Sequence, residues 1–573
     1  MKNFSIKRIF QFCLASVSIL FFHLTHAAPT LPASTETSRV MQQVSTSATT
    51  EQQQSAPPPL VVSPKEVKMS EQMAAIKFKF IKFILQGNTV YSDKELLALF
   101  PKKPGEQISL GDIQQFANDI TKKYSNDGYV LSEAILPPQH IKNGIVKIEI
   151  IEGYVDQVNV EGNVSPRIKA LIKRYGEKAT NSKPFKVNNL EREMLLANDI
   201  PGMQVKSVIH PSKTKIGAAD ITLIPEFKPL DLNLDYDNRG TRYIGPTRFI
   251  ASGDVNWPLG DGAITTLRVS ESGYASEMRY LEMEHKQLFG TNGLTFDIDG
   301  QLGFTHPEFV LATSNTLGHN KVILTTLQYP VIRTRSQDLY INGGFNYINS
   351  RTDQFNTKLY NDLIRPIFIG FSYDLTDQHS GYNVISGTIT RGLKIMGASQ
   401  PYNLISRTGA VPKFTKFNLN VSRIQAINTA LTIAFTASGQ YACNPLYVYE
   451  QIGYGGLPYG DAYDPSEIIA DEGVEAKIEL RLDTYFPIKV LPVQYYVNYD
   501  GGVLWNKNTT NTPFRQTGTS TGVGIRTNPI PHVSLSLELA KPLDRSPAAI
   551  VAIPGFTGNP RAFRGFFTLT VTG

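Results

Sequence analysis

The second half of the chain alternates apolar with polar residues over many short segments. From residue 229 to residue 573, stretches of about ten residues change character at every second position, and Gly, Asn, Asp or Pro separates them. This period of two is typical of strands with one apolar and one polar face. We count about 16 such segments, which predicts a large antiparallel β structure.

A closed barrel in a membrane fits this pattern best. Outer-membrane barrels use an even number of strands, and the segment leaves about 21 residues for each strand with its loop. A secreted sandwich or propeller is the alternative, but the strands show no blade-like repeat. We therefore predict a membrane all-β barrel of 16 antiparallel strands over residues 229–573.

Two shorter units precede the barrel and share one order of elements. Residues 76–153 have the order strand, helix, helix, strand, strand, and residues 154–228 repeat it. In the first unit Ile113 and Phe116 begin one apolar helix face, and Ser109 is in position to cap that helix. The pattern predicts two small α+β modules in tandem.

The first 75 residues are expected to form no domain. Residues 1–27 combine three basic residues, an apolar core and small residues before Ala28, which predicts a cleaved signal peptide, with a membrane anchor as the alternative. Residues 28–75 are rich in Ser, Thr, Gln and Pro, which predicts a linker. A short helix over residues 34–44 stays open.

Charge and cysteine content narrow the classes of partner. The formal net charge is +6, and the signal peptide contributes three of these charges, which leaves about +3 for the mature chain. So small an excess does not favour nucleic acid as a partner. Cys13 leaves with the signal peptide, so Cys443 remains alone, and we expect no internal disulfide and no cysteine-rich metal site.

No motif predicts an enzyme. Residues 518–522 match G-x-S-x-G, but they run into an alternating strand instead of the strand-to-helix turn of a serine hydrolase. P-loop, HExxH and paired Cys–His patterns are absent from the sequence. We expect no catalytic residue, no metal and no cofactor.

Three short motifs resemble one family of transporters. LPPQ at 136–139, NDIPG at 198–202 and DNRG at 237–240 are similar to the two-partner secretion transporters of the haemolysin-activator and filamentous-haemagglutinin type (ShlB/FhaC/HecB). The resemblance extends over residues 76–573. It implies that the two modules are POTRA domains in the periplasm and that the barrel lies in the outer membrane of a Gram-negative cell.

The resemblance implies export of one large secreted protein. That partner is expected to be a β-helical exoprotein, either a haemolysin, an adhesin or a contact toxin. A monomeric barrel in outer-membrane lipid would let it pass without nucleotide hydrolysis. An outer-membrane assembly factor and a passive porin or receptor are the alternatives. The three motifs and the presence of only two modules favour secretion.

One acidic segment is implied to fold back into the barrel. It lies in a loop over about residues 452–473, between the eleventh and twelfth predicted strands, and resembles the sixth barrel loop of the family. Asp500 and Gly501 are the wall residues expected to contact it. The residues expected to lie in the lumen are Tyr459, Gly460, Asp461, Tyr463 and Asp464.

The loop departs from the family at its tip. The family places Arg where this chain has Asp461, and that Arg pairs with a carboxylate at the position of Asp500. Two adjacent carboxylates repel or share a proton. We expect a shared proton, a cation or basic side chain between them, or a differently seated loop. An Asp461→Arg change is expected to tighten the loop.

A strand of the second module is the expected partner site. An extended incoming chain can add to an exposed sheet edge. The candidate contacts are Val205, Ser207 and Ile209. The alternative is that Met203, Val205 and Val208 fill the core of the module. The residues alone do not separate the two interpretations.

Overall fold

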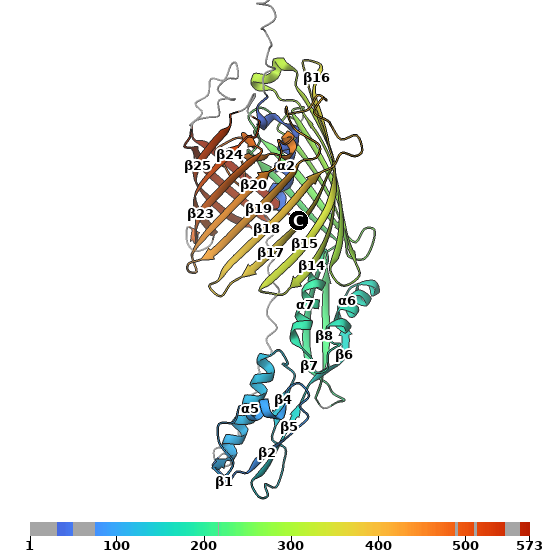
Figure 1. Ribbon diagram of the computed structural model, residues 1–573, viewed down its shortest axis with the longest axis vertical. Coiled ribbons are helices and arrows are strands. Elements are labelled where there is room, and N and C mark those ends of the chain that lie inside the picture. Colours follow the sequence, from blue (N-terminus) through green and yellow to red (C-terminus); the bar gives the residue numbers. More distant parts are fainter. Residues whose placement is uncertain are drawn as a thin grey trace, which may run out of the picture.

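The chain forms a wide barrel with a two-module arm at one rim (Figure 1). The predicted signal peptide and most of the predicted linker lie outside the described residues. The computed structural model describes residues 31–49, 75–215, 217–274, 276–486, 491–508, 513–544 and 562–573.

The first module is a small sheet covered by helices. Its central strand is β5 (Ile145–Ile151), which pairs in parallel with β2 and antiparallel with β4. Phe83, Phe116 and Ile120 lie in its buried core. The remaining elements are β1 (Lys77–Lys79), β2 (Lys82–Gln86), α4 (Asp93–Leu97), β3 (Gln107–Ser109), α5 (Leu110–Asn126) and β4 (Glu133–Ile135).

Helix α5 begins where its cap residue predicts. The Ser109 hydroxyl accepts a hydrogen bond from the Asp112 backbone N–H (3.1 Å), and the Asp112 carboxylate accepts one from the Ser109 N–H (2.8 Å). This reciprocal pair is a capping box, which satisfies N–H groups that the helix cannot bond. After the helix, Gly128 has φ of +90°, a conformation that favours glycine at a helix end.

The second module repeats the plan of the first. Its sheet order is β6-β8-β7, so β7 lies at an edge. Ile172, Tyr175 and Leu196 are buried between the helices and the sheet. The elements are β6 (Tyr154–Val160), α6 (Pro166–Ala179), α7 (Val187–Asn198), β7 (Met203–Pro211) and β8 (Ala218–Phe227).

Two motif residues bind the backbone of neighbouring strands through their side-chain amides. The Gln139 amide of LPPQ accepts from the Lys147 N–H (2.8 Å) and donates to the Lys147 carbonyl (2.7 Å). The Asn198 amide of NDIPG accepts from the Val205 N–H (2.8 Å) and donates to the Val205 carbonyl (3.2 Å). Each amide supplies the donor and the acceptor that a neighbouring strand would supply.

The rest of NDIPG joins the second module to the barrel. The Arg333 guanidinium donates two hydrogen bonds to the Asp199 carboxylate, at 2.6 and 2.8 Å. The Trp257 indole donates to the Pro201 carbonyl (3.1 Å). Gly202 has φ of +70° and no room for a Cβ. These contacts hold the module against the turns at the rim.

The barrel closes with 16 antiparallel strands in the described part of the chain, as the alternation predicts. β16 and β17 form one strand that is interrupted at Arg365. The strands are β9 (Leu230–Asp237), β10 (Arg248–Asn256), β11 (Ala263–Ser272), β12 (Met278–Phe289), β13 (Leu294–Thr305), β14 (Leu317–Arg333), β15 (Gln337–Gln354), β16 (Thr357–Ile364), β17 (Pro366–Thr376), β18 (Gly381–Gly392), β19 (Thr415–Ala426), β20 (Leu431–Ala442), β23 (Glu472–Phe486), β24 (Leu491–Trp505), β25 (Arg515–Ile530), β26 (Val533–Pro542) and β27 (Arg564–Thr572).

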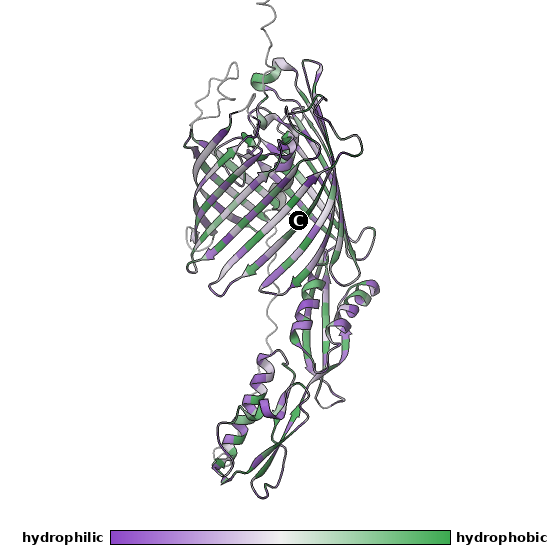
Figure 2. Cartoon of the chain, viewed as in Figure 1, coloured by the Kyte–Doolittle hydropathy of each residue, from purple (hydrophilic) through white to green (hydrophobic). Residues whose placement is uncertain are grey.

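The barrel wall has an apolar outer face and a polar inner face. On β24, Val497 and Tyr499 are 52% and 51% exposed on the outside, whereas Asn498 and Asp500 are 1% and 0% exposed. Hydrophobic and hydrophilic positions alternate in the same way along the other strands (Figure 2). The alternation places polar side chains in the lumen and apolar ones against lipid.

The DNRG motif closes the barrel between its first and last strands. The Asn238 amide accepts from the Phe567 N–H (2.8 Å) and donates to the Gly565 carbonyl (2.9 Å), so it extends the ladder between β9 and β27. Asp237 forms a two-bond ion pair with Arg248, at 3.0 and 2.9 Å. The motif therefore fixes the strand that begins the barrel to both neighbours.

A helix lies inside the barrel. It is α2 (Thr37–Thr49), preceded by the short helix η1 (Ala33–Thr35) (Figure 1). Val40, Met41 and Val44 are 4%, 1% and 0% exposed. This part of the predicted linker is therefore buried in the lumen. Within the described ranges, none of the helices combines the length and apolarity needed to cross a membrane.

Candidate functional site

The long loop between the eleventh and twelfth strands runs into the lumen. It begins after Ala442 and ends before Glu472, and every residue from 459 to 468 is buried. Its inward course accounts for a length that no simple hairpin turn requires. Its elements are η3 (Val448–Glu450) and the hairpin of β21 (Ile452–Tyr454) and β22 (Ile468–Ala470).

Asp500 on the wall meets the loop through neutral donors. Its carboxylate accepts hydrogen bonds from the Tyr454 hydroxyl, the Gly460 backbone N–H (3.0 Å) and the Ser520 hydroxyl (2.8 Å). Ser520, the central residue of the G-x-S-x-G match, thus lies within strand β25. Gly460 has φ of +87°, which lets its N–H face the carboxylate.

The glycines that contact the loop are Gly502 and Gly518, and not the expected Gly501. A Cβ at Gly501 would meet Thr519 and the Gly518 carbonyl of the next strand, not the loop. At Gly502 and Gly518, by contrast, a Cβ would lie 2.7 and 2.3 Å from the Tyr454 ring. Because these two positions carry no side chain, the Tyr454 ring can pack directly against the wall.

A basic side chain on the wall lies beside the two aspartates. The Lys477 ammonium contacts the Asp461 carboxylate, and Asn498 donates to the same carboxylate oxygen (3.0 Å). Lys477 also lies directly opposite Asp500 in the register of β23 and β24. The Lys477–Asp461 contact is consistent with one of the three arrangements expected for these aspartates, a basic side chain beside them.

Asp464 joins the loop to both ends of the barrel wall. Arg242, in the loop after β9, and Arg564, at the start of β27, both contact its carboxylate, the latter at 2.8 Å. Asp464 is fully buried. Tyr463 donates from its hydroxyl to the Thr519 carbonyl (3.2 Å) beside this cluster. A cavity of about 260 Å³ borders the two arginines.

Helix α2 fits a hollow in the wall on one side. A Cβ at Gly303 would lie 0.9 Å from the Met41 methyl carbon, and a Cβ at Gly318 would lie 1.8 Å from the Thr37 hydroxyl. Thr37 also hydrogen-bonds to Thr305. The two glycines, on adjacent strands β13 and β14, therefore make space for the helix.

The opposite side of α2 binds the loop. Gln42 donates to the Tyr449 carbonyl (3.2 Å), Gln43 donates to the Gly455 carbonyl (3.0 Å), and Arg39 donates to a third loop carbonyl. Residues 39, 42 and 43 share one helix face, while residues 37, 40, 41 and 44 share the face toward the wall. The helix thus lies between the wall and the loop.

The edge strand β7 is only partly closed. Val205 is 6% exposed and packs in the core of the module, and its backbone is bonded by Asn198. Ser207 and Ile209 are half-buried, and Ile209 packs against the same core. The alternative, that residues of this strand fill the core, is right for Met203 and Val205 and wrong for Val208, which is 39% exposed.

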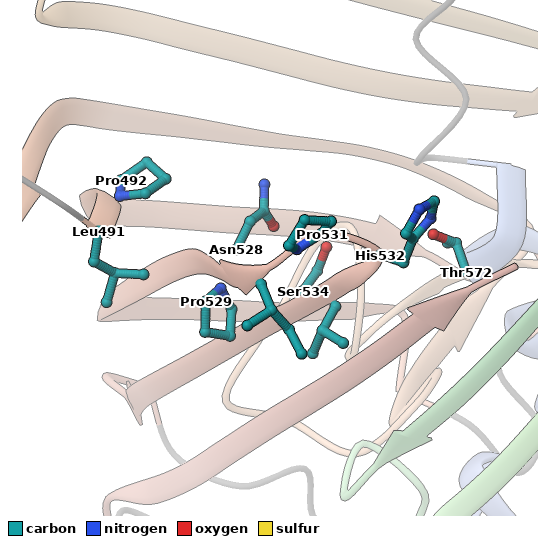
Figure 3. A pocket seen from close by; sticks show the side chains of 10 residues that line it. Leu491, Pro492, Asn528, Pro529, Pro531, His532, Ser534 and Thr572 are labelled. Carbon is teal, nitrogen blue, oxygen red and sulfur yellow. The ribbon is translucent and has the colours of Figure 1, made fainter.

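A second cavity lies at the turn between β25 and β26 (Figure 3). Its volume is about 430 Å³, and His532 is the titratable side chain in its lining. Such a lining offers little for acid–base chemistry. Within the described ranges, no group of three or more His, Cys, Asp or Glu residues is arranged to hold a metal ion.

Several residues of the site were not expected from the sequence. Lys477 could have been found, because alternation along β23 turns it to the same side as the buried Glu475 and Glu479. The other contacts depend on closure of the barrel, which no local pattern shows. These residues are Arg242, Arg564, Gly303 and Gly318.

Known proteins share this architecture. Heme/hemopexin transporter protein HuxB of Haemophilus influenzae is 24% identical over 488 residues, which are 81% of this chain and 83% of that protein. Outer membrane transporter CdiB of Dickeya dadantii (strain 3937) is 20% identical over 490 residues, again 81% and 83%. CdiB from Escherichia coli has the same fold, with a TM-score of 0.73 at 18% identity over 96% of this chain and 100% of that one.

Family descriptions match both parts of the molecule. The POTRA domain of ShlB type matches residues 78–153. The description "Haemolysin secretion/activation protein ShlB/FhaC/HecB" matches residues 220–526, which is more than half of the chain. The chain therefore belongs to the ShlB/FhaC/HecB family and is a two-partner secretion transporter of the outer membrane, with its POTRA modules in the periplasm and a large partner protein as its cargo.

Proposed function

We propose that this transporter captures one large β-helical exoprotein on the open edge of β7 and passes it through a barrel that the loop and helix α2 close at rest. In this proposal residues 76–228 are the capture arm and residues 229–573 are the channel. Energy comes from folding of the exported protein outside the cell and not from nucleotide hydrolysis. The observation that supports this proposal most directly is the incomplete closure of the β7 edge.

The outward backbone groups of β7 belong to its odd-numbered residues. Val205 lies opposite Pro225 of β8, and Pro225 has no N–H to donate. The Val205 N–H and carbonyl point away from β8 and meet Asn198. Because orientation repeats every second residue, the backbone groups of Ser207 and Ile209 point to the same open side.

These two residues are suited to bind an extended chain. The described residues provide them with no edge partner such as Asn198 provides for Val205. An added strand would form backbone hydrogen bonds there, and α7 would border it on one side. A partner that later forms a β-helix already has the extended segments that such an edge selects.

The lumen is filled in a way that fits a closed resting state. Loop residues Tyr459, Asp461 and Tyr463 are at most 8% exposed, and α2 lies between the loop and the wall. A monomer suffices for this arrangement, because a closed barrel leaves no strand edge for a second copy.

Proline at position 207 tests the capture site. Ser207→Pro removes the outward N–H and leaves the ladder to β8 intact, so we expect a loss of secretion of about tenfold or more. Ser207→Ala, which retains the N–H, is the matched control and is expected to secrete normally. The readout is the amount of exported partner at equal outer-membrane levels of the transporter. Normal secretion by a folded Ser207→Pro variant would exclude capture at this edge.

A further inference from the structure

Lys477 reaches the tip of the lumen loop from the barrel wall. The Lys477 and Asp461 side chains are 12% and 0% exposed, so their contact is almost completely shielded from water. A carboxylate in that setting requires a cation or several hydrogen-bond donors. Asn498 adds one donor to Asp461 and another to Glu538, both at 3.0 Å.

The neighbouring cations have other partners. Arg239 donates to Glu538 at 2.6 Å, so its charge is matched on the far side of Asn498. Arg242 and Arg564 both contact Asp464. Among the described residues, Lys477 is therefore the cation in direct contact with Asp461.

Lys477 serves the wall aspartate as well as the loop aspartate. In the register of β23 and β24 it lies opposite Asp500, and cross-strand neighbours on one face lie about 5 Å apart. Asp500 itself is bonded to the loop through neutral donors. One lysine thus stands where the loop carboxylate and the wall carboxylate would otherwise face each other.

We propose that Lys477 is the residue that positions the lumen loop, by supplying from the barrel wall the positive charge that Asp461 on the loop requires. The inference rests on the proposed function, in which the seated loop narrows the lumen. The charges are reversed relative to the pattern that the sequence resembles, because here the acid is on the loop and the base is on the wall. Arg at position 461 would therefore face Lys477 and be repelled by it, so Asp461→Arg would loosen the loop and not tighten it.

A thiol at the loop tip reports whether the loop is seated. Ala462 is 2% exposed beside Asp461. We would introduce Ala462→Cys together with Cys443→Ser in the mature full-length chain, since Cys443 is exposed. The rate of labelling by a small maleimide and the single-channel current in planar bilayers are then measured for each variant.

Loss of the lysine and reversal of the aspartate are expected to release the loop. Lys477→Met and Asp461→Arg should each label about tenfold faster or more and should raise current noise. Lys477→Arg should behave as the parent. The double change Asp461→Lys with Lys477→Asp should return labelling to within about threefold of the parent. Lys286→Met, which removes a lysine from β12, is the control and should change neither readout.

Two results would overturn the proposal. One is a Lys477→Met variant that labels at the parent rate. The other is a charge-swapped pair that labels as fast as the single variants. Heat-modifiable migration in gels shows whether each barrel is folded, and if Lys477→Met does not fold, the charge-swapped pair decides. The effect of Ser207→Pro on secretion is measured separately, so failure of this proposal and failure of capture at β7 are distinguishable.

Discussion

The lumen holds two inserted segments that are fastened by different chemistry. Helix α2 is fastened by packing and by hydrogen bonds to hydroxyl and carbonyl groups. Among the described residues, no ion pair between charged side chains joins this helix to the wall. The loop, in contrast, is fastened by buried ion pairs, which are Asp461 with Lys477, Asp464 with Arg242 and Arg564, and Asp471 with Arg407.

The difference indicates which segment moves first. Breaking a buried ion pair leaves an uncompensated charge in a shielded site, whereas water can replace the bonds that Gln42 and Gln43 make to carbonyls. The loop is also continuous with β20 and β23 at its two ends. We therefore expect α2 to leave the lumen before the loop changes its seat.

The largest effect is expected from removing the Asp464 carboxylate, which joins the loop to the barrel wall. Asp464→Asn leaves Arg242 and Arg564 without their shared carboxylate, and loss of one partner in a buried pair costs about 3–5 kcal/mol. Thermal unfolding of the detergent-solubilised barrel measures the loss. Glu271→Gln, in an exposed pair with Arg279, is the control and should cost about 1 kcal/mol or less. If the parent, Asp464→Asn and Glu271→Gln unfold at equal temperatures, the ion pairs of Asp464 do not stabilise the barrel.

An intermediate effect is expected from filling the hollow in the wall against which α2 packs. Gly303→Leu places a side chain where Met41 lies, and overpacking of this kind costs about 1–3 kcal/mol. That energy corresponds to an increase of about 5- to 150-fold in the open fraction of the channel. Planar-bilayer conductance measures it. At Gly300, on the same strand, a Cβ would meet nothing nearer than 3.8 Å, so Gly300→Leu should leave the channel closed.

The smallest effect is expected from one polar contact of the helix. Gln43→Ala removes the hydrogen bond to the Gly455 carbonyl, which contributes about 1 kcal/mol. The open fraction should rise about fivefold, without any change in the unfolding temperature of the barrel. A drop in that temperature as large as the one expected for Asp464→Asn would show that the helix and the loop are not separate units.

The fold could be predicted because its signals are local. Alternation along each strand reports which side faces lipid, so the 16 strands follow from residues such as Val497 and Asn498. The stripe of Ile113 and Phe116 with the cap at Ser109 likewise defines α5 within its own sequence. Such elements carry their information in neighbouring residues.

The lumen contacts could be predicted only in part, because they join distant residues. The sequence over 34–44 has weak helix formers, and α2 is stabilised by a hollow at Gly303 and by loop carbonyls hundreds of residues away. No local pattern distinguishes Lys477 from other strand residues, because its partner Asp461 lies on the tip of the loop. The charge reversal at Asp461 was visible in the sequence, but the identity of its partner was not.

The side-chain amides at strand edges also matter for the behaviour of many copies in one periplasm. An unpaired edge is a template on which any extended chain can pair and start aggregation. Gln139 covers the part of β5 that β4 does not reach, Asn198 covers the start of β7, and Asn238 extends the ladder at the junction of the barrel. On β7 the open part of the edge is then short, at Ser207 and Ile209. A second arm that paired there would form few hydrogen bonds, whereas an exported chain would also lie against α7. Side-chain amides of this kind reduce the length of strand edge that copies of the arm offer to one another.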